Sequence, residues 1–173
     1  MKFVSIEKKK KSIMHKHEFL NGEGSWTTRA DRSEEIPLQE FSESLQALSE
    51  VACEIMSIPQ DQRGQLKPYR LTVIRTKNGT RSVQVHFNRT YEELGSEQKE
   101  KTPMFRIDKP ENGESGVVVL NDDHLKIVNT AISRAEDYIN GKRQQMTFEE
   151  WEQKHEAIPQ KENEENLLSD MTM

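Results

Sequence analysis

Residues 38–56, LQEFSESLQALSEVACEIM, carry the clearest structural signal in the chain. Their apolar side chains recur at steps of four and three residues, at Phe41, Leu45, Leu48, Ala52 and Ile55. That spacing places them on one face of an α-helix. We therefore expect an amphipathic helix over this stretch, with Pro37 in its first turn and Pro59 beyond its end.

A second stretch, residues 123–140, has the same rhythm. Its apolar stripe consists of Leu125, Val128, Ile132, Ala135 and Ile139. Asn121 and Asp122 precede it as good helix caps, and Gly141 follows it as a natural stop. We expect a second amphipathic helix, so both helices need an apolar layer to cover.

Residues 69–87 predict a β-hairpin around Lys77-Asn78-Gly79. A three-residue loop, unlike a two-residue Asn-Gly loop, puts the apolar residues of both strands on one shared face. It pairs Val73 with Val83, Leu71 with Val85 and Tyr69 with Phe87. We expect a type I turn with a bulge and with Gly79 in the left-handed conformation.

The remaining strands lie between turn-rich segments. We expect them at residues 2–20, 26–30, 104–107 and 117–120. The last of these is a continuous apolar run, which indicates a strand inside the sheet. Residues 92–101 are highly charged, and there we expect a loop.

These elements predict an α+β fold: an antiparallel sheet of five or six strands with two amphipathic helices on one face. We expect a single domain over residues 1–141 and a C-terminal tail over 142–173. Thr147 and Glu150 have the spacing of a capping box, which predicts a short helix over 148–157. The acidic end of the chain, from residue 160, is expected to be disordered.

The composition sets limits on the class of protein. The 173 residues are 32% hydrophobic and 32% charged, with a net charge of -5. No apolar run approaches the roughly 18 residues that a transmembrane helix needs, so we expect no membrane partner. The first residues have their charges after the apolar ones, the reverse of a secretory signal, and we expect a cytoplasmic location.

The single cysteine, Cys53, excludes an intramolecular disulfide and a cysteine-based zinc cluster. It lies beside the apolar stripe of the first helix. No neighbouring His or Lys would activate its thiol, so we interpret Cys53 as a core residue rather than a catalytic nucleophile.

Basic residues gather in the first part of the chain and on the hairpin. Lys8 to Lys11 form a run that is explained either by contact with nucleic-acid phosphates or by a charged edge strand that resists aggregation. A basic sheet face with aromatic residues such as Trp26 and Tyr91 would follow a single strand. The candidate nucleic-acid-binding residues are Lys8, Lys9, Lys10, Lys11, Lys16, Arg70, Arg75 and Arg81.

Sequence templates for enzymes are absent: the chain has no GxGxxG, GxxxxGK[ST], GxSxG or HExxH. We therefore expect a protein without catalytic activity or a cofactor. His15 and His17 would share one side of a strand and offer two metal ligands, but a third is not apparent in the sequence, and no metal site is expected. Asp122, Asp123 and His124 are better explained as a helix cap than as a metal cluster.

The order of four segments resembles a family of small uncharacterised proteins of temperate phages and prophages. The segments are LQEFSESLQALSEVACEIMSIP (38–59), LTVIRTKNGTRSVQVHF (71–87), VVVLNDD (117–123) and AEDYINGKRQQMTF (135–148). The resemblance implies a phage gene carried among replication and recombination functions, with the protein in the host cytoplasm. It implies no catalytic residues.

Residues 144–148, QQMTF, are similar to the peptide with which bacterial proteins bind the DNA sliding clamp. In that peptide two apolar side chains fill a pocket while a glutamine supplies a hydrogen bond. Thr147 departs from this pattern because it stands where leucine is wanted. The candidate partner-binding residues are Gln144, Phe148 and Trp151.

Three hypotheses about function remain open. The first, which we favour, is a non-catalytic accessory protein of phage DNA metabolism that binds nucleic acid through a basic sheet face or the N-terminal strand. The second is a protein-protein adaptor or inhibitor of a host or phage enzyme, with a host or phage replication or recombination protein as a candidate partner. The third is a self-assembling, clamp-like dimer or ring that associates with DNA.

Overall fold

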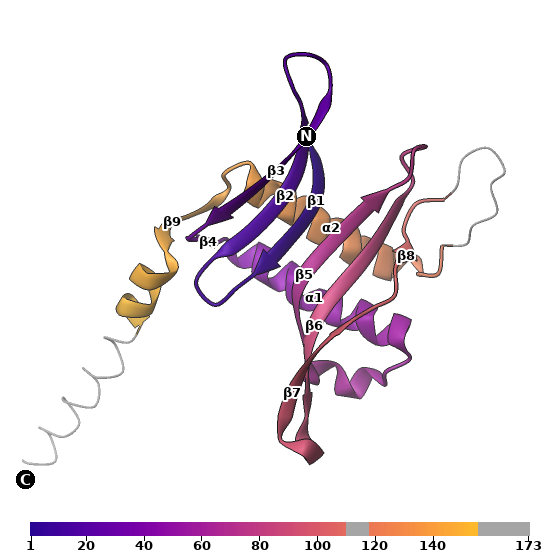
Figure 1. The fold of residues 1–173 in the computed structure, drawn as a ribbon. Helices are drawn as coiled ribbons and strands as arrows, with labels where there is room; N and C mark the ends of the chain where they lie inside the picture. The colour runs from indigo at the N-terminus through magenta and orange to yellow at the C-terminus, as the bar shows by residue number, and fades with distance from the viewer. Residues whose placement is uncertain (110–117, 156–173) are drawn as a thin grey trace, which may run out of the picture.

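The computed structural model describes residues 1–109 and 118–155, and it confirms the α+β fold with both long helices on one face of an antiparallel sheet (Figure 1). Within these residues the main sheet has seven strands rather than five or six. Its order is β3-β2-β1-β5-β6-β7, and β8 pairs with β6. A second sheet joins β4 and β9.

The elements of the main sheet are β1 (Lys2–Lys8), β2 (Ile13–Leu20), β3 (Trp26–Ser33), β5 (Leu66–Arg75), β6 (Arg81–Tyr91), β7 (Ser96–Lys101) and β8 (Phe105–Arg106). The small sheet consists of β4 (Glu35–Pro37) and β9 (Arg143–Thr147). The helices are α1 (Gln39–Met56) and α2 (Asp122–Ile139), with short 3-10 turns η1 (Gln60–Gln65) and η2 (Glu92–Leu94).

The two helices lie side by side behind the sheet (Figure 1) and enclose the main core. Leu48 from α1 and Val128 from α2 are fully buried against the sheet residues Leu71 and Val85. The expected cap of α2 is confirmed, since the Oδ1 atom of Asn121 accepts a hydrogen bond from the His124 backbone N–H at 2.8 Å. The apolar stripes therefore face the layer that the sequence predicted.

A smaller cluster extends the core beneath the last turns of α1. Cys53 lies in it and is fully buried, as are Ala52, Leu66 and Phe87, and Ile58 is nearly so. Burial raises the pKa of the Cys53 thiol. The interpretation of Cys53 as a core residue is confirmed.

The β5–β6 hairpin has the predicted register near its turn. Leu71 pairs with Val85 and Val73 with Val83. Gly79 has a φ of +83°, and its N–H donates to the carbonyl of Thr76 at 2.9 Å, as a type I turn with a left-handed glycine requires. Farther along, a bulge between Pro68 and Arg70 shifts the register, so that Phe87 pairs with Pro68 instead of Tyr69.

The first twenty residues form two strands, so the expectation of one strand over 2–20 is wrong. The chain reverses after Lys8, where the Lys9 N–H donates to the carbonyl of Ser12 at 2.8 Å. β1 lies inside the sheet between β2 and β5, which makes the charged edge strand explanation of Lys8 to Lys11 wrong as well. A turn made of lysines carries none of the Gly, Pro or Asn signals that mark a reversal.

Two further expectations are corrected. Residues 96–101, expected in a loop, form strand β7 against the end of β6. Residues 118–120 form no strand, and the Val119 side chain is 64% exposed. Residue 117 lies outside the described residues. A polar strand such as SEQKEK has no apolar alternation, and its pairing depends on the neighbouring backbone that β6 offers.

The strand expected at 104–107 is present over the two residues of β8, and the returning strand expected at 26–30 extends through Ser33 as β3. The first turn of α1 begins after Pro37, which itself belongs to strand β4. Pro59 follows the end of α1 as expected and precedes η1.

Beyond Gly141 the chain remains ordered against the domain. Strand β9 pairs with β4, and Phe148 packs against the main core. The predicted capping box is confirmed: the Glu150 N–H donates to Thr147 Oγ1 at 3.1 Å, and the Thr147 N–H donates to a Glu150 carboxylate oxygen at 2.9 Å. Residues 148–155 are helical; the end of the predicted helix and the acidic tail lie outside the described residues.

Among residues 1–109 and 118–155, neither α1, α2 nor any shorter helix combines the length and the apolar composition that crossing a membrane would require.

Candidate functional site

The face of the main sheet opposite α1 and α2, here called the open face, presents a row of polar side chains. Cross-strand pairing brings together Glu7, Arg70, His86 and Lys101, from β1, β5, β6 and β7 in turn. Directly paired residues point to the same side of a sheet, so these four side chains are neighbours. Burial, followed by the charges of Arg70 and Lys101, lowers the pKa of His86.

Aromatic rings stand beside cations at both ends of the open face. Lys99 Nζ lies 5.7 Å from the ring centroid of Tyr69, which in turn lies 6.2 Å from the ring of His86. At the other end, Lys2 Nζ lies 3.8 Å from the ring centroid of Trp26, which is 48% exposed. The open face thus combines positive charge with rings on which bases can stack.

Basic side chains outnumber acidic ones on the open face, although the whole chain has a net charge of -5. By strand alternation, the basic residues are Lys2, Lys16, Arg32, Lys67, Arg70, Lys99, Lys101 and Arg106. The acidic residues on the same strands are Glu7, Glu18 and Glu97. The overall acidity therefore lies elsewhere on the molecule.

Arg70 and Lys16, both predicted from the sequence to bind nucleic acid, lie on the open face, whereas Arg75 and Arg81 do not. Arg75 pairs directly with Arg81, two residues beyond the buried pair Val73–Val83, so both point to the helix side.

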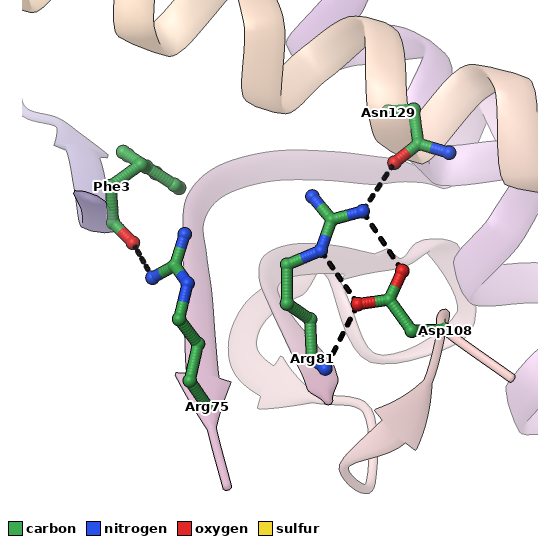
Figure 2. A network of polar contacts seen from close by, with 5 residues as sticks. All are labelled: Phe3, Arg75, Arg81, Asp108 and Asn129. Carbon is green, nitrogen blue, oxygen red and sulfur yellow. Dashed lines mark hydrogen bonds and ion pairs between the residues drawn. The ribbon is translucent and has the colours of Figure 1, made fainter. Parts of the chain in front are cut away.

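Both helix-side arginines already have partners there. Figure 2 shows Arg81 bound to Asp108 and to Asn129 of α2, and Arg75 Nη1 donating to the carbonyl of Phe3. Tyr91, expected beside the basic face, also lies on the helix side, where its hydroxyl donates to Glu100.

The lysine run occupies the β1–β2 turn. Lys9 and Lys10 are exposed, and Lys11 Nζ lies 3.9 Å from a carboxylate oxygen of Glu152 in the C-terminal helix. Lys8 ends β1 and points to the helix side, since it pairs with the buried Ile13. The run is therefore separate from the open-face row around Arg70.

The three predicted partner-binding residues line one groove. Gln144, Phe148 and Trp151 surround a space of about 360 Å³ together with Ile36 and Pro37. Gln144 Nε2 donates to the carbonyl of Pro37 at 3.4 Å, and Phe148 packs against the core. Residues 144–148, which are similar to the clamp-binding peptide, are thus part of the fold. To bind a sliding clamp as a free peptide does, this segment would have to leave its pairing in strand β9.

A cleft of about 740 Å³ lies on the helix side of the β2–β3 hairpin, near the end of α2 and strand β9. His15, His17 and Asp31 line it, and their potential ligand atoms all lie within 4.8 Å of one another. The sequence supplied the two histidines but missed Asp31, because the returning strand was expected to end at Ala30. The hairpin register, which pairs His15 with Asp31, is the signal that finds it.

Comparisons of the chain with models of protein families, with curated proteins and with solved structures find no match, so its family is not shown by similarity.

Proposed function

We propose that this protein is a non-catalytic accessory protein that binds single-stranded nucleic acid on the open face of its main sheet. The observation that carries the proposal is the row Arg70, His86 and Lys101, flanked by the Lys99–Tyr69 contact. The resemblance of the sequence to temperate-phage proteins favours a role in phage DNA replication or recombination.

The physical basis is that of other single-strand-binding surfaces. Basic side chains neutralise phosphates and release counterions, while aromatic rings stack on bases without regard to their identity. Tyr69 and Trp26 supply such rings, each beside a lysine ammonium group. The open face also presents these groups to an extended strand more readily than to the grooves of a duplex.

The test is fluorescence anisotropy with labelled oligonucleotides, single-stranded and duplex, over a range of salt concentrations. We expect tighter binding of the single strand and an affinity that falls linearly with salt on logarithmic axes. The double variant Arg70→Gln/Lys101→Gln should weaken binding and reduce the salt slope by roughly one to two.

The matched control is Lys126→Gln/Lys154→Gln, which removes the same charge from exposed helical positions away from the open face. It should bind as the unmodified protein does. Absence of binding at low salt, or equal losses in the two double variants, would contradict the proposal.

A second candidate function is an adaptor or inhibitor that binds a replication or recombination protein. The groove beside Phe148 favours it, because Trp151 at its rim is 41% exposed and stacks on His155 with ring centroids 4.0 Å apart. Aromatic residues of this kind often anchor protein interfaces. Trp151→Ala should abolish capture of a specific partner from host lysate, whereas His155→Ala should weaken it less.

A further inference from the structure

The helix side of the β2–β3 hairpin contains a four-residue arrangement that the open-face proposal does not use. His15 pairs directly with Asp31, and His17 pairs with Arg29. Since His15 and His17 are two residues apart on one strand, all four side chains point to the same side of the hairpin. That side borders the cleft, opposite to the face proposed for nucleic acid.

The two imidazoles are held in place by packing. The rings of His15 and His17 stack with centroids 5.7 Å apart, and His15 also meets the edge of Tyr138 at 6.3 Å. His15 is only 4% exposed. A buried ring fixed in this manner is a pre-organised ligand.

Each of these histidines has a buried nitrogen without a hydrogen bond. The Nδ1 atoms of His15 and His17 have no partner among the described residues. A buried polar atom left unpaired costs free energy, so native proteins usually satisfy it with a partner, a water or an ion. A water or an ion in this cleft would satisfy the two unpaired nitrogens.

We propose that His15, His17 and Asp31 bind a divalent transition-metal ion, of which Zn²⁺ is the representative. Ligand atoms around one tetrahedral Zn²⁺ lie about 3.4 Å apart. The three groups already lie within 4.8 Å of one another, so small side-chain rotations would close the site.

The donor set suits this class of ion. Two imidazole nitrogens and one carboxylate are typical ligands of Zn²⁺ and of Fe²⁺, whereas Mg²⁺ and Ca²⁺ prefer oxygen ligands alone. Three protein ligands leave a coordination position for water, and the cleft is large enough to admit one.

Two of the three arginines that line the cleft, Arg29 and Arg143, already have partners, and the third, Arg32, points to the open face by strand alternation. Arg29 Nε lies 2.8 Å from Asp31 Oδ2, and Arg143 donates to the carbonyl of Tyr138 at 2.8 Å and to Ser33 Oγ at 3.0 Å. These contacts make an anion a poorer occupant than a cation. Arg29 is 63% exposed, so it can leave Asp31 for solvent when the ion arrives.

The test is isothermal titration calorimetry of the full-length, tag-free protein with Zn²⁺. The visible absorption of Co²⁺, used as a substitute for Zn²⁺, reports binding independently. We expect one ion per chain. His17→Gln and Asp31→Asn should each weaken binding by at least about tenfold. Arg29→Gln should strengthen it severalfold, because it removes the cation that competes for Asp31; a purely structural role for these residues would not produce this increase.

His86→Gln on the open face is the control and should bind Zn²⁺ as the unmodified protein does. Circular dichroism establishes that each variant is folded, and inorganic phosphate is titrated as the competing occupant. Four outcomes would each overturn the proposal: absence of 1:1 binding, affinity in His17→Gln and Asp31→Asn unchanged from that of the unmodified protein, weaker binding in Arg29→Gln, or saturable binding of phosphate in place of Zn²⁺.

Discussion

Arg81 and Asp108 form a bidentate ion pair, with Arg81 Nε 2.8 Å from Asp108 Oδ2 and Arg81 Nη2 3.0 Å from Asp108 Oδ1 (Figure 2). The backbone N–H of Arg81 donates to the same carboxylate at 3.0 Å. The pair fastens the segment after β8 to the start of β6, and Arg81 also reaches Asn129 on α2. The side-chain hydrogen bonds from Arg81 lower the pKa of Asp108 and raise that of Arg81.

This ion pair predicts a pH-dependent contribution to stability. The pKa of Asp108 in the folded protein lies below its ordinary value of 3.8, so its stabilisation is complete above that value and is lost as the pH falls through the folded value. Asp108→Asn should lower the free energy of unfolding by about 1 kcal/mol at pH 7, since the pair is partly exposed. Urea unfolding at pH 7 and near pH 3 should show the difference shrinking in acid.

Asp137→Asn is the control for the acid experiment. Asp137 also pairs with basic side chains, Arg134 and Lys142, but both of those are more exposed than Arg81. The substitution should change stability less than Asp108→Asn does. If Asp108→Asn lowered the free energy of unfolding as much near pH 3 as at pH 7, the stabilising role assigned to the ionised Asp108 carboxylate would be contradicted.

The burial of Cys53 predicts an unreactive thiol. Its raised pKa keeps it protonated at neutral pH, and its side chain is fully buried. Ellman's reagent should react with it slowly in the native protein and promptly in guanidinium chloride. Rapid reaction of the native protein would show that the small cluster around Cys53 opens readily.

The main core predicts a large effect at Leu48, which is fully buried between α1 and the sheet. Leu48→Ala should reduce the free energy of unfolding by about 2–5 kcal/mol, because it removes apolar contacts and leaves a cavity. Leu94→Ala, at a side chain that is 69% exposed, should have almost no effect. Equal effects in a denaturant titration would place the core elsewhere.

The cap of α2 predicts a smaller and chemically specific effect. Asn121→Ala removes the acceptor of the His124 N–H and should cost about 1 kcal/mol. Asn121→Ser keeps an acceptor at that position and should restore most of the stability. Thermal unfolding followed by circular dichroism measures both, and failure of serine to rescue would argue against a capping role.

The edges of the main sheet predict a monomer in solution. The outermost strands, β3 and β7, present alternating charges, including those of Arg29 and Asp31 on β3 and of Lys99 and Glu100 on β7. Charged edges oppose pairing between copies of a chain. Light scattering should give a mass near 20.2 kDa; a larger mass would favour the self-assembling hypothesis.

Local patterns in the sequence were sufficient to predict both long helices, the cap at Asn121, the capping box at Thr147 and the register of the strands next to the β5–β6 turn. In each case the signal lies within a few residues, since helical periodicity, side-chain caps and a left-handed glycine are local properties of the chain. The β5–β6 register was correct only up to Tyr69, where a bulge displaced the pairing. The sequence does carry a sign of that bulge, because Pro68 has no N–H for the ladder of an internal strand and such prolines occur at bulges.

Only the tertiary structure decided which segments meet. β7 and the β4–β9 pair depend on hydrogen bonds to distant backbone, and polar strands carry no apolar alternation that would reveal them. Arg75 and Arg81 are an exception, because strict alternation from the predicted pair Val73–Val83 already puts them on the helix side, and grouping them with Arg70 by charge was the error. The same alternation, acting across two strands, brought Asp31 beside His15, a proximity that neither strand encodes alone.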